Sequence, residues 1–534
     1  MCREKSLAIF LFYLLLFSYP LLSFFWRHDY PVFTIEVGLI TLIVVMSGIF
    51  LTLVLCQVRQ SIAVFLTALM ICMVFIVQFN LQVAGVITCF FISLALTWRL
   101  KSQFYPYSLP IMMALIGGAF FDSVEQDGRI HPQLDSSRLS SELPSIVHII
   151  LDSFVGMDGL PDYPASEVIK DEVYRFFGDY NFKVFPAAYS RYAITGDSLY
   201  SALNFQNDGD SEFLLEHLEH LDLGGLRKHV MTSNAEFSAL ESLGYRFNIY
   251  QTEHIDFCQS NPEPIDRCWN YQHPNVASIQ HARDPVVRVK MLMTVMLTQS
   301  RLTKQAIKGL VYDQGIAMHD PRVFLYLQDD LLQSSAGHVF FAHMLIPHGP
   351  FAFMHDCSVN YDSSPIIRYH WTGIEEEDPA IYEYRTMKYF EQMECALLSL
   401  RQLFDKMKKA GIFENSIIVI HSDHGYTVVP HTPVLSNINA LTSEDYRVSF
   451  SVLFAVKFPN QAFEIDHRVL PLSFLLEEFT SAIVDNAVGE NADWTFLQNL
   501  PADSDKLAPY VFLWGSHPMK RVDINIFENL PFPQ

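Results

Sequence analysis

Acidic and imidazole side chains stand at the ends of the segments of this sequence that read as buried strands. The segment SIVHIILD ends in Asp152, and the segment SIIVIHSD ends in Asp423, which is followed by His424. A third segment, HVFFAHMLI, contains His343 and is followed shortly by His348. Two carboxylates and an imidazole suit a divalent cation such as Zn²⁺ or Mn²⁺, with Mg²⁺ as a further option. Aspartate also begins ordinary loops, but two such strand ends favour a site for one metal ion.

The segment AAYSRYAITGDSLYSALNF (187–205) places a hydroxyl group at the start of a predicted helix. Thr195 precedes Gly196, Asp197 and Ser198, and an apolar helical pattern follows. The free N–H groups and the dipole at a helix N-terminus bind the oxygens of phosphate or sulfate. A metal ion that lowers the pKa of the hydroxyl would make Thr195 a nucleophile. An ordinary N-cap threonine is the alternative interpretation.

These side chains need a scaffold that brings the strand ends together. From residue 145 onward, short apolar runs alternate with helical patterns, which is typical of an α/β domain with a doubly wound, mostly parallel sheet. Such sheets bind ligands at the carboxyl ends of their strands. Gly425 is expected to let the backbone turn away from the site without a side chain crowding it. The predicted strands are 145–152, 246–251, 338–346, 416–423 and 448–456, and a long helix is predicted over 383–411.

The first 121 residues are predicted to form a five-helix transmembrane region. Spanning a bilayer takes about 17–25 apolar residues. Five stretches meet this length, namely Leu7–Trp26, Val37–Cys56, Ser61–Phe79, Leu81–Trp98 and Tyr105–Phe121. A signal peptide is the competing interpretation of the first stretch, but it lacks a small-residue cleavage site. The distribution of Lys and Arg predicts a cytoplasmic N-terminus. Five spans then leave a juxtamembrane linker, 122–144, and a domain, 145–534, outside the cytoplasm.

Charge and cysteine usage narrow the function of the outer region. The chain has a net charge of −22, and all of that excess lies beyond residue 121, where 30 basic and 55 acidic residues remain. Nucleic acid is therefore not an expected partner, because phosphate backbones need a basic surface. Four cysteines lie in the outer region, and an oxidising compartment favours disulfides. The pair Cys258 and Cys268 is favoured; free thiols and a zinc site are the alternatives.

The order of the motifs resembles the alkaline phosphatase superfamily. Asp152 is followed by Thr195 after 43 residues, then by PHGP and by SDHG. Within the superfamily the chain is most similar to the membrane-anchored sulfatase-like group, which includes phosphoethanolamine transferases, lipoteichoic acid synthases and phosphoglycerol transferases. The resemblance implies an alkaline phosphatase-like fold and a threonine nucleophile that forms a phospho-threonine. It implies one metal ion held by Asp152, Thr195, Asp423 and His424. It also implies that three histidines face the substrate, namely His343, His348 and His431.

Departures from the family pattern limit what the resemblance implies. The sulfatase signature, in which Cys or Ser is followed by x-Pro-x-Arg, is absent from the sequence, which argues against sulfatase activity. No Asp-x-x-x-His pair for a second permanent metal occurs in the domain 145–534, so a one-metal site is expected. The context of Thr195 matches no single branch closely, which leaves Ser198 and Ser153 as alternative nucleophiles.

The expected protein is an enzyme of the bacterial inner membrane with a periplasmic catalytic domain. A membrane phospholipid is the expected donor of a phosphoethanolamine or phosphoglycerol head group, and an envelope glycolipid, a glycan or water is the expected acceptor. An inactive sulfatase-fold protein that binds lipid and regulates the envelope is the alternative function. A transporter is disfavoured, because the predicted spans carry almost no charge.

Overall fold

The computed structural model divides into two compact units. The first comprises residues 1–128 and 275–316, and the second comprises 129–274 and 317–534. The segment 275–316 thus groups with the N-terminal helices, although the sequence analysis placed it in the domain 145–534. The structure describes residues 2–27, 30, 32–79, 83–122, 143–207, 218–222, 227–252, 255–259, 265–271, 285–298, 322–333, 336–349, 351, 353–358, 379–426, 429, 431–487, 494, 496–497, 507, 509–515 and 519–524.

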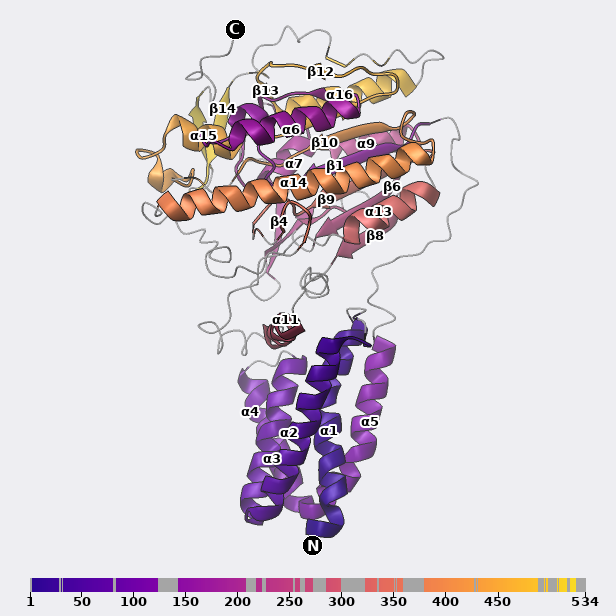
Figure 1. The fold of residues 1–534 in the computed structure, drawn as a ribbon, viewed down its shortest axis with the longest axis vertical. Coiled ribbons are helices and arrows are strands. Elements are labelled where there is room, and N and C mark those ends of the chain that lie inside the picture. The colour runs from indigo at the N-terminus through magenta and orange to yellow at the C-terminus, as the bar shows by residue number, and fades with distance from the viewer. Residues whose placement is uncertain are drawn as a thin grey trace. The chain divides into compact units, whose positions relative to one another are not determined.

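The first unit is a bundle of apolar helices (Figure 1). A helix covers each of the five apolar stretches, but only Ser6–Trp26 and Ile35–Gln57 are long and apolar enough to cross a membrane. The apolar parts of the other three helices are shorter, so the structure gives two candidate spans and the five-span topology stays a prediction. The helices of this unit are α1 (Cys2–Arg27), α2 (Ile35–Gln57), α3 (Gln60–Phe79), α4 (Val83–Leu100), the short η1 (Lys101–Gln103), α5 (Phe104–Asp122) and α11 (Pro285–Thr298).

The second unit contains an eight-stranded, mostly parallel sheet with β1 (Ile146–Leu151) near its centre. The strand order is β12-β2-β11-β10-β1-β9-β6-β8. β1 runs parallel to β10 (Ile417–His421) and β9 (His338–Met344), and β9, β6 (Arg246–Thr252) and β8 (Ile265–Tyr271) continue the parallel part. Beyond β10 the sheet ends in β11 (Phe454–Lys457), β2 (Lys183–Val184) and β12 (Glu464–Ile465), with β11 antiparallel to both neighbours. The prediction of a mostly parallel sheet is confirmed.

One predicted strand is wrong. Residues 448–456 were expected to be extended, but Ser443–Phe450 forms helix α15, and β11 begins only at Phe454. The reason is local, because Thr442 and Asp445 form a capping box that starts the helix. Such reciprocal bonds satisfy two backbone N–H groups that a helix start otherwise leaves without partners.

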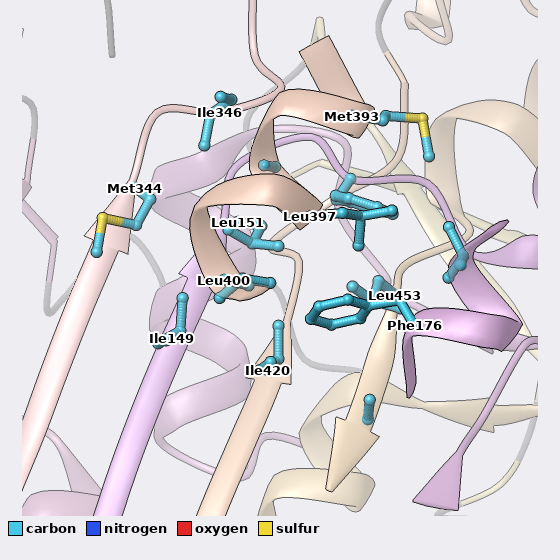
Figure 2. Close-up of a cluster of buried hydrophobic side chains, with 14 of the residues drawn as sticks. Ile149, Leu151, Phe176, Met344, Ile346, Met393, Leu397, Leu400, Ile420 and Leu453 are labelled. Atoms are coloured by element: carbon cyan, nitrogen blue, oxygen red, sulfur yellow. The ribbon is translucent and has the colours of Figure 1, made fainter. Parts of the chain in front are cut away.

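Helices cover both faces of the sheet and bury alternate residues of the central strands. On one face, Ile149 and Leu151 of β1 share a core with the helices α6 (Ser166–Asp179), α13 (Arg322–Gln333) and α14 (Pro379–Lys409). Figure 2 shows Met393, Leu397 and Leu400 of α14 above Ile149 and Ile420. On the other face, Ile150 and Val419 pack with α7 (Thr195–Leu203), α9 (Ala235–Ser242) and α16 (Leu472–Ala487).

Smaller elements complete the second unit. They are η3 (Met157–Gly159), β3 (Ala188–Tyr189), β4 (Leu218–Asp222), β5 (Arg227–Met231), β7 (Ile255–Asp256), η4 (Leu435–Asn437), β13 (Leu470–Pro471), β14 (Tyr510–Leu513) and β15 (Lys520–Asp523). Two disulfides cross-link it: the predicted pair Cys258–Cys268, which is confirmed, and Cys357–Cys395, which joins a loop to α14.

Candidate active site

The carboxyl ends of three neighbouring strands bring the predicted acids and histidines together. Asp152 follows β1, Asp423 and His424 follow β10, and His343 lies one residue before the end of β9. The register places His343 directly beside Ile150 of β1, two residues before Asp152. Successive odd or even residues of a strand share a face. Asp152 and His343 therefore project from the same side of the sheet, and ligand atoms of Asp152, His343 and Asp423 lie within 4.8 Å of one another.

The predicted nucleophile joins this buried cluster. Thr195 Oγ1 lies 3.2 Å from His424 Nε2. The same nitrogen lies 3.3 Å from Asp423 Oδ2 and 3.9 Å from Asp152 Oδ1. His343 Nε2 lies 3.3 Å from the other oxygen of Asp152. The structure thus brings together all four predicted metal ligands, and it adds His343, which the sequence analysis assigned to the substrate side.

The donor set fits a divalent cation. The Nδ1 atom of His424 lies 2.9 Å from Gly425 O, a carbonyl that can only accept, so Nδ1 carries the proton. The unprotonated Nε2 then faces two carboxylate oxygens, an arrangement that is repulsive without a positive charge among the three atoms. Asp423 Oδ2 is buried and accepts no hydrogen bond from any described residue. A buried carboxylate oxygen without a donor is costly, and a metal ion would supply its missing partner.

The protonation state of Asp152 agrees with a ligand role. Burial alone would raise the pKa of its carboxyl. The interactions of Asp152 with His348, His343 and His424 outweigh burial, and the pKa of its carboxyl lies below its ordinary value. Since metals bind the ionised carboxylate, no proton has to be removed from Asp152 at neutral pH.

The two acidic turns are hydrogen-bonded to each other. Ser153, directly after Asp152, has a left-handed backbone with φ of 64°. Its N–H donates to Asp423 Oδ1 at 2.9 Å, and its hydroxyl donates to Asp152 Oδ1 at 3.0 Å. The N–H of Phe154 donates to Ser422 Oγ at 2.8 Å. These bonds fix one oxygen of each acid and leave the others directed into the cluster. Ser153 therefore orients the acids, although the sequence analysis kept it as an alternative nucleophile.

Tyr389 of α14 holds the strained turn, and sequence reasoning missed it. Its buried hydroxyl donates to Ser153 O at 2.8 Å and accepts from the N–H of Val155 at 2.9 Å. Burial raises the pKa of Tyr389, so the hydroxyl keeps its proton. The ring stacks on Tyr426, with centroids 4.0 Å apart. A left-handed non-glycine residue costs about 1–3 kcal/mol and persists only where its surroundings fix it. In the sequence, Tyr389 looks like any other aromatic residue of an amphipathic helix.

Helix α7 presents Thr195 at its first turn. The residue before it, Ile194, is the N-cap and makes no side-chain capping bond, so the alternative of an N-cap threonine is wrong. Ser198, the other alternative nucleophile, is committed to structural bonds: its hydroxyl donates to Asp423 O and contacts Ser190 Oγ at 2.7 Å. The hydrogen bond from Ser198 to Asp423 O attaches α7 to the Asp423 turn and keeps Thr195 beside His424.

Gly425 is required by space rather than by backbone conformation. Its φ is not among the positive values, so no left-handed conformation calls for a glycine here. Its N–H donates to Ser449 O at 2.9 Å. A Cβ atom at this position would lie 2.1 Å from Val448 O and 2.7 Å from Ser451 O. The glycine therefore lets the Asp423 turn pack directly on the backbone of α15.

His348 and His431 lie in loops near these elements, and their substrate-facing roles stay predictions. His348 is partly exposed, and the side chain of Gln392 donates to its carbonyl at 2.8 Å. The backbone N–H and the Nδ1 atom of His431 both bond to the buried carboxylate of Asp445, at 3.0 and 3.2 Å. Among the described residues, no contact joins His431 to the Asp152 cluster.

A buried polar chain behind the site was also missed. Glu236 of α9 lies 2.8 Å from His148 Nδ1, and His148 Nε2 lies 2.7 Å from His421 Nε2. His421 Nδ1 lies 2.9 Å from Ser422 O, so it carries the proton, and His421 Nε2 accepts from His148. This series of hydrogen bonds fixes the backbone of Ser422, the residue before Asp423. Its sequence signal was a histidine inside each of two apolar strands.

Comparisons with known proteins give structural neighbours only. No family model matches the sequence, and no curated protein matches it. The C-terminal periplasmic domain of EcEptC from Escherichia coli is similar with a TM-score of 0.40 and 12% identity, over 74% of this chain and 96% of that one. The 2-O GAG sulfatase BT1596 has a TM-score of 0.41 and 12% identity, over 70% and 77% of the two chains. The phosphonate monoester hydrolase of Agrobacterium radiobacter has a TM-score of 0.38 and 10% identity, over 64% and 73%.

These three neighbours are a periplasmic domain, a sulfatase and a phosphonate monoester hydrolase. Their TM-scores and identities are low, and the function proposed below depends on the residues of the site.

Proposed function

We propose that this chain is a metal-dependent, membrane-anchored enzyme that transfers or hydrolyses a phosphorus-linked group through Thr195. The observation that carries the proposal is the 3.2 Å contact between Thr195 Oγ1 and His424 Nε2, at the edge of the Asp152, His343 and Asp423 cluster. A hydroxyl beside so many metal-binding atoms, at the first turn of a helix, has the surroundings of a nucleophile. An inactive relative would have no reason to keep a complete set of metal ligands.

The residues divide the chemistry between them. Asp152, Asp423, His424 and His343 would hold a divalent ion, which would supply positive charge to make the Thr195 hydroxyl more acidic and to offset charge on phosphoryl oxygens. Thr195 Oγ1 gives up its proton to solvent and attacks phosphorus, the bond from phosphorus to the leaving oxygen breaks, and the leaving oxygen takes up a proton. An acceptor hydroxyl or water then attacks the phospho-threonine and restores Thr195. The backbone N–H groups of the first turn of α7 stabilise the phosphoryl oxygens.

The proposed substrates follow from the membrane helices. Two candidate spans precede the site in the chain, and a soluble substrate would not require them. The proposed donor is a membrane phospholipid that carries a phosphoethanolamine or phosphoglycerol head group, and the acceptor is an envelope glycolipid, a glycan or water. The proposed location is the bacterial inner membrane, with five spans, a cytoplasmic N-terminus and the second unit in the periplasm. His348 and His431 are proposed to bind the head group or to protonate the leaving oxygen.

The first test combines metal content with turnover in the full-length protein in detergent. The wild type should bind about one Zn²⁺ or Mn²⁺ per chain, and the double variant Asp423→Ala, His424→Ala should bind none. Thr195→Ala should lose release of a labelled phospholipid head group, and the wild type should show a phosphate on Thr195 by mass spectrometry. The control is Thr480→Ala, which removes a buried threonine of α16 that bonds only to its own helix in the structure. Turnover by Thr195→Ala would contradict the nucleophile, and a wild type that binds no metal would favour the lipid-binding regulator.

A further inference from the structure

Helix α11 is an apolar helix from the middle of the sequence that packs with the N-terminal bundle. The chain reaches it after β8 of the second unit and returns to α13 of that unit. Leu292 is fully buried and Met296 nearly so, in a core shared with Leu21, Phe24, Phe25, Tyr30, Val37, Ile40 and Val44. α11 lies across one end of the bundle, where α1 ends and α2 begins (Figure 1).

A buried ion pair fixes α11 in this place. Arg288 Nε lies 2.8 Å from Glu36 Oε2, and the Tyr30 hydroxyl donates to Glu36 Oε1 at 2.8 Å. Glu36 is buried in the first turn of α2, whose other residues are almost all apolar. Without Arg288 this carboxylate would keep hydrogen bonds, including those from Tyr30 and Thr34, but no counter-ion, and a buried charge that loses its counter-ion is strongly destabilising. The acid in α2 is therefore explained by α11.

The core that α11 shares with α2 extends along the first part of this candidate span. Val44 lies nine residues after the start of α2, which is roughly 13 Å along a helix that rises 1.5 Å per residue. Half of a bilayer's hydrocarbon core is about 15 Å. If α2 spans the membrane, α11 shares a buried core with the outer part of that span and is not surrounded by bulk water.

The face of α11 turned away from the bundle has the character of a lipid contact. Val286, Lys290 and Met293 are spaced four and three residues apart, so they share one face. Val286 is 56% exposed, Met293 is 37% exposed, and Lys290 is also exposed. One lysine between two apolar side chains matches an acyl chain and the phosphate above it, because lysine stems lie along apolar surface while the amine reaches the head groups.

We propose that α11 is a re-entrant helix of the outer membrane leaflet, and that its Val286, Lys290 and Met293 face binds phospholipid. The proposal rests on the membrane anchoring proposed above. The proposed partner of α11 is a phospholipid. Its acyl chain contacts Val286 and Met293, and its phosphate group binds Lys290.

Depth-dependent fluorescence quenching tests this placement in the full-length protein. An environment-sensitive dye is attached to one introduced cysteine at a time, after the free cysteines Cys72 and Cys89 are changed to serine. Met293→Cys reports on α11, and Met46→Cys, 57% exposed on α2, is the matched lipid-facing control. Val168→Cys, 65% exposed on α6 of the second unit, is the matched aqueous control. Vesicles of phosphatidylethanolamine and phosphatidylglycerol carry either nitroxide-labelled phospholipid or none, and iodide is the aqueous quencher.

The expected result is that the dye at position 293 behaves like the dye at position 46. Both should have blue-shifted emission that lipid nitroxide quenches and iodide does not, and the dye at position 168 should show the reverse. Quenching at 293 by iodide, with lipid quenching kept at 46, would overturn the placement of α11 alone. Protection of 293 from both quenchers would indicate a protein contact and would also overturn it. Iodide quenching at 46 would instead refute the proposed membrane anchor.

Discussion

Replacing Gly425 by alanine tests the close contact between the Asp423 turn and α15. The added Cβ would lie 2.1 Å from Val448 O, whereas ordinary contact begins at 3.4 Å. The three nearest atoms are all backbone, so no side chain can swing aside. The turn or α15 would have to move by about 1 Å, and overpacking of this kind costs about 1–3 kcal/mol or more. Because metal–ligand distances tolerate only about 0.2 Å, such a shift should also remove the bound metal.

The assay measures metal content, head-group release and the midpoint of urea unfolding on the same full-length preparation. Gly425→Ala should lose metal and turnover and should unfold at lower urea. The matched control is Gly178→Ala in α6, where the nearest atoms are ring carbons of Phe463 at 3.8 Å. Alanine is the better helix former by about 1 kcal/mol, so this control should be neutral or stabilising. Wild-type metal content and stability in Gly425→Ala would refute the packing inferred at this turn.

Three further changes probe the surroundings of the site. Tyr389→Phe leaves two buried backbone groups at the Ser153 turn without their partner, which should cost about 1–3 kcal/mol of stability. The midpoint of urea unfolding and the zinc affinity measured by titration should both fall, and an unchanged zinc affinity would argue against a positioning role for Tyr389. Burial and the neighbouring His148 imidazole hold the pKa of His421 well below 6.5. As the pH falls through 6.5, the imidazole of residue 421 takes up a proton in the unfolded chain but not in the folded chain. The free energy of unfolding should therefore fall more steeply from about pH 7 to about pH 5 in the wild type than in His421→Gln. Removing the Cys357–Cys395 disulfide, whose partners are 38 residues apart, by a double change to serine should destabilise by about 4 kcal/mol in the chain-entropy account; equal unfolding midpoints would show that the bond adds no constraint.

Strand ends were predictable because their signal is local. The apolar runs before Asp152 and Asp423 could only be buried strands, and parallel strands bring their carboxyl ends to one edge. The 448–456 segment failed for an equally local reason, since its apolar residues fit a strand or a helix and the capping box at Thr442 and Asp445 decides for the helix.

Contacts between distant segments could not be predicted from one sequence. Tyr389 acts on Ser153 across 236 residues, and Glu236 meets His148 across 88. The helix pattern around Tyr389 indicates which residues are buried, but it does not indicate what a buried hydroxyl will reach. Gly425 illustrates the same limit, because its own sequence context suggests a turn and only the neighbouring helix shows that a Cβ has no room.

The position of β1 in the sheet has a consequence for the order in which the protein can assemble during synthesis. β1 ends at Leu151, but the strands on either side of it end only at Met344 and His421. At about 5–20 residues per second, β10 leaves the ribosome roughly 15–55 s after β1. Until β9 has been made, the segment IVHIIL is apolar with both strand edges unpaired, and one edge stays unpaired until β10 follows; such a segment is the kind that aggregates. We therefore expect nascent chains of this protein to depend on a chaperone that binds extended apolar segments until the last central strand has been made.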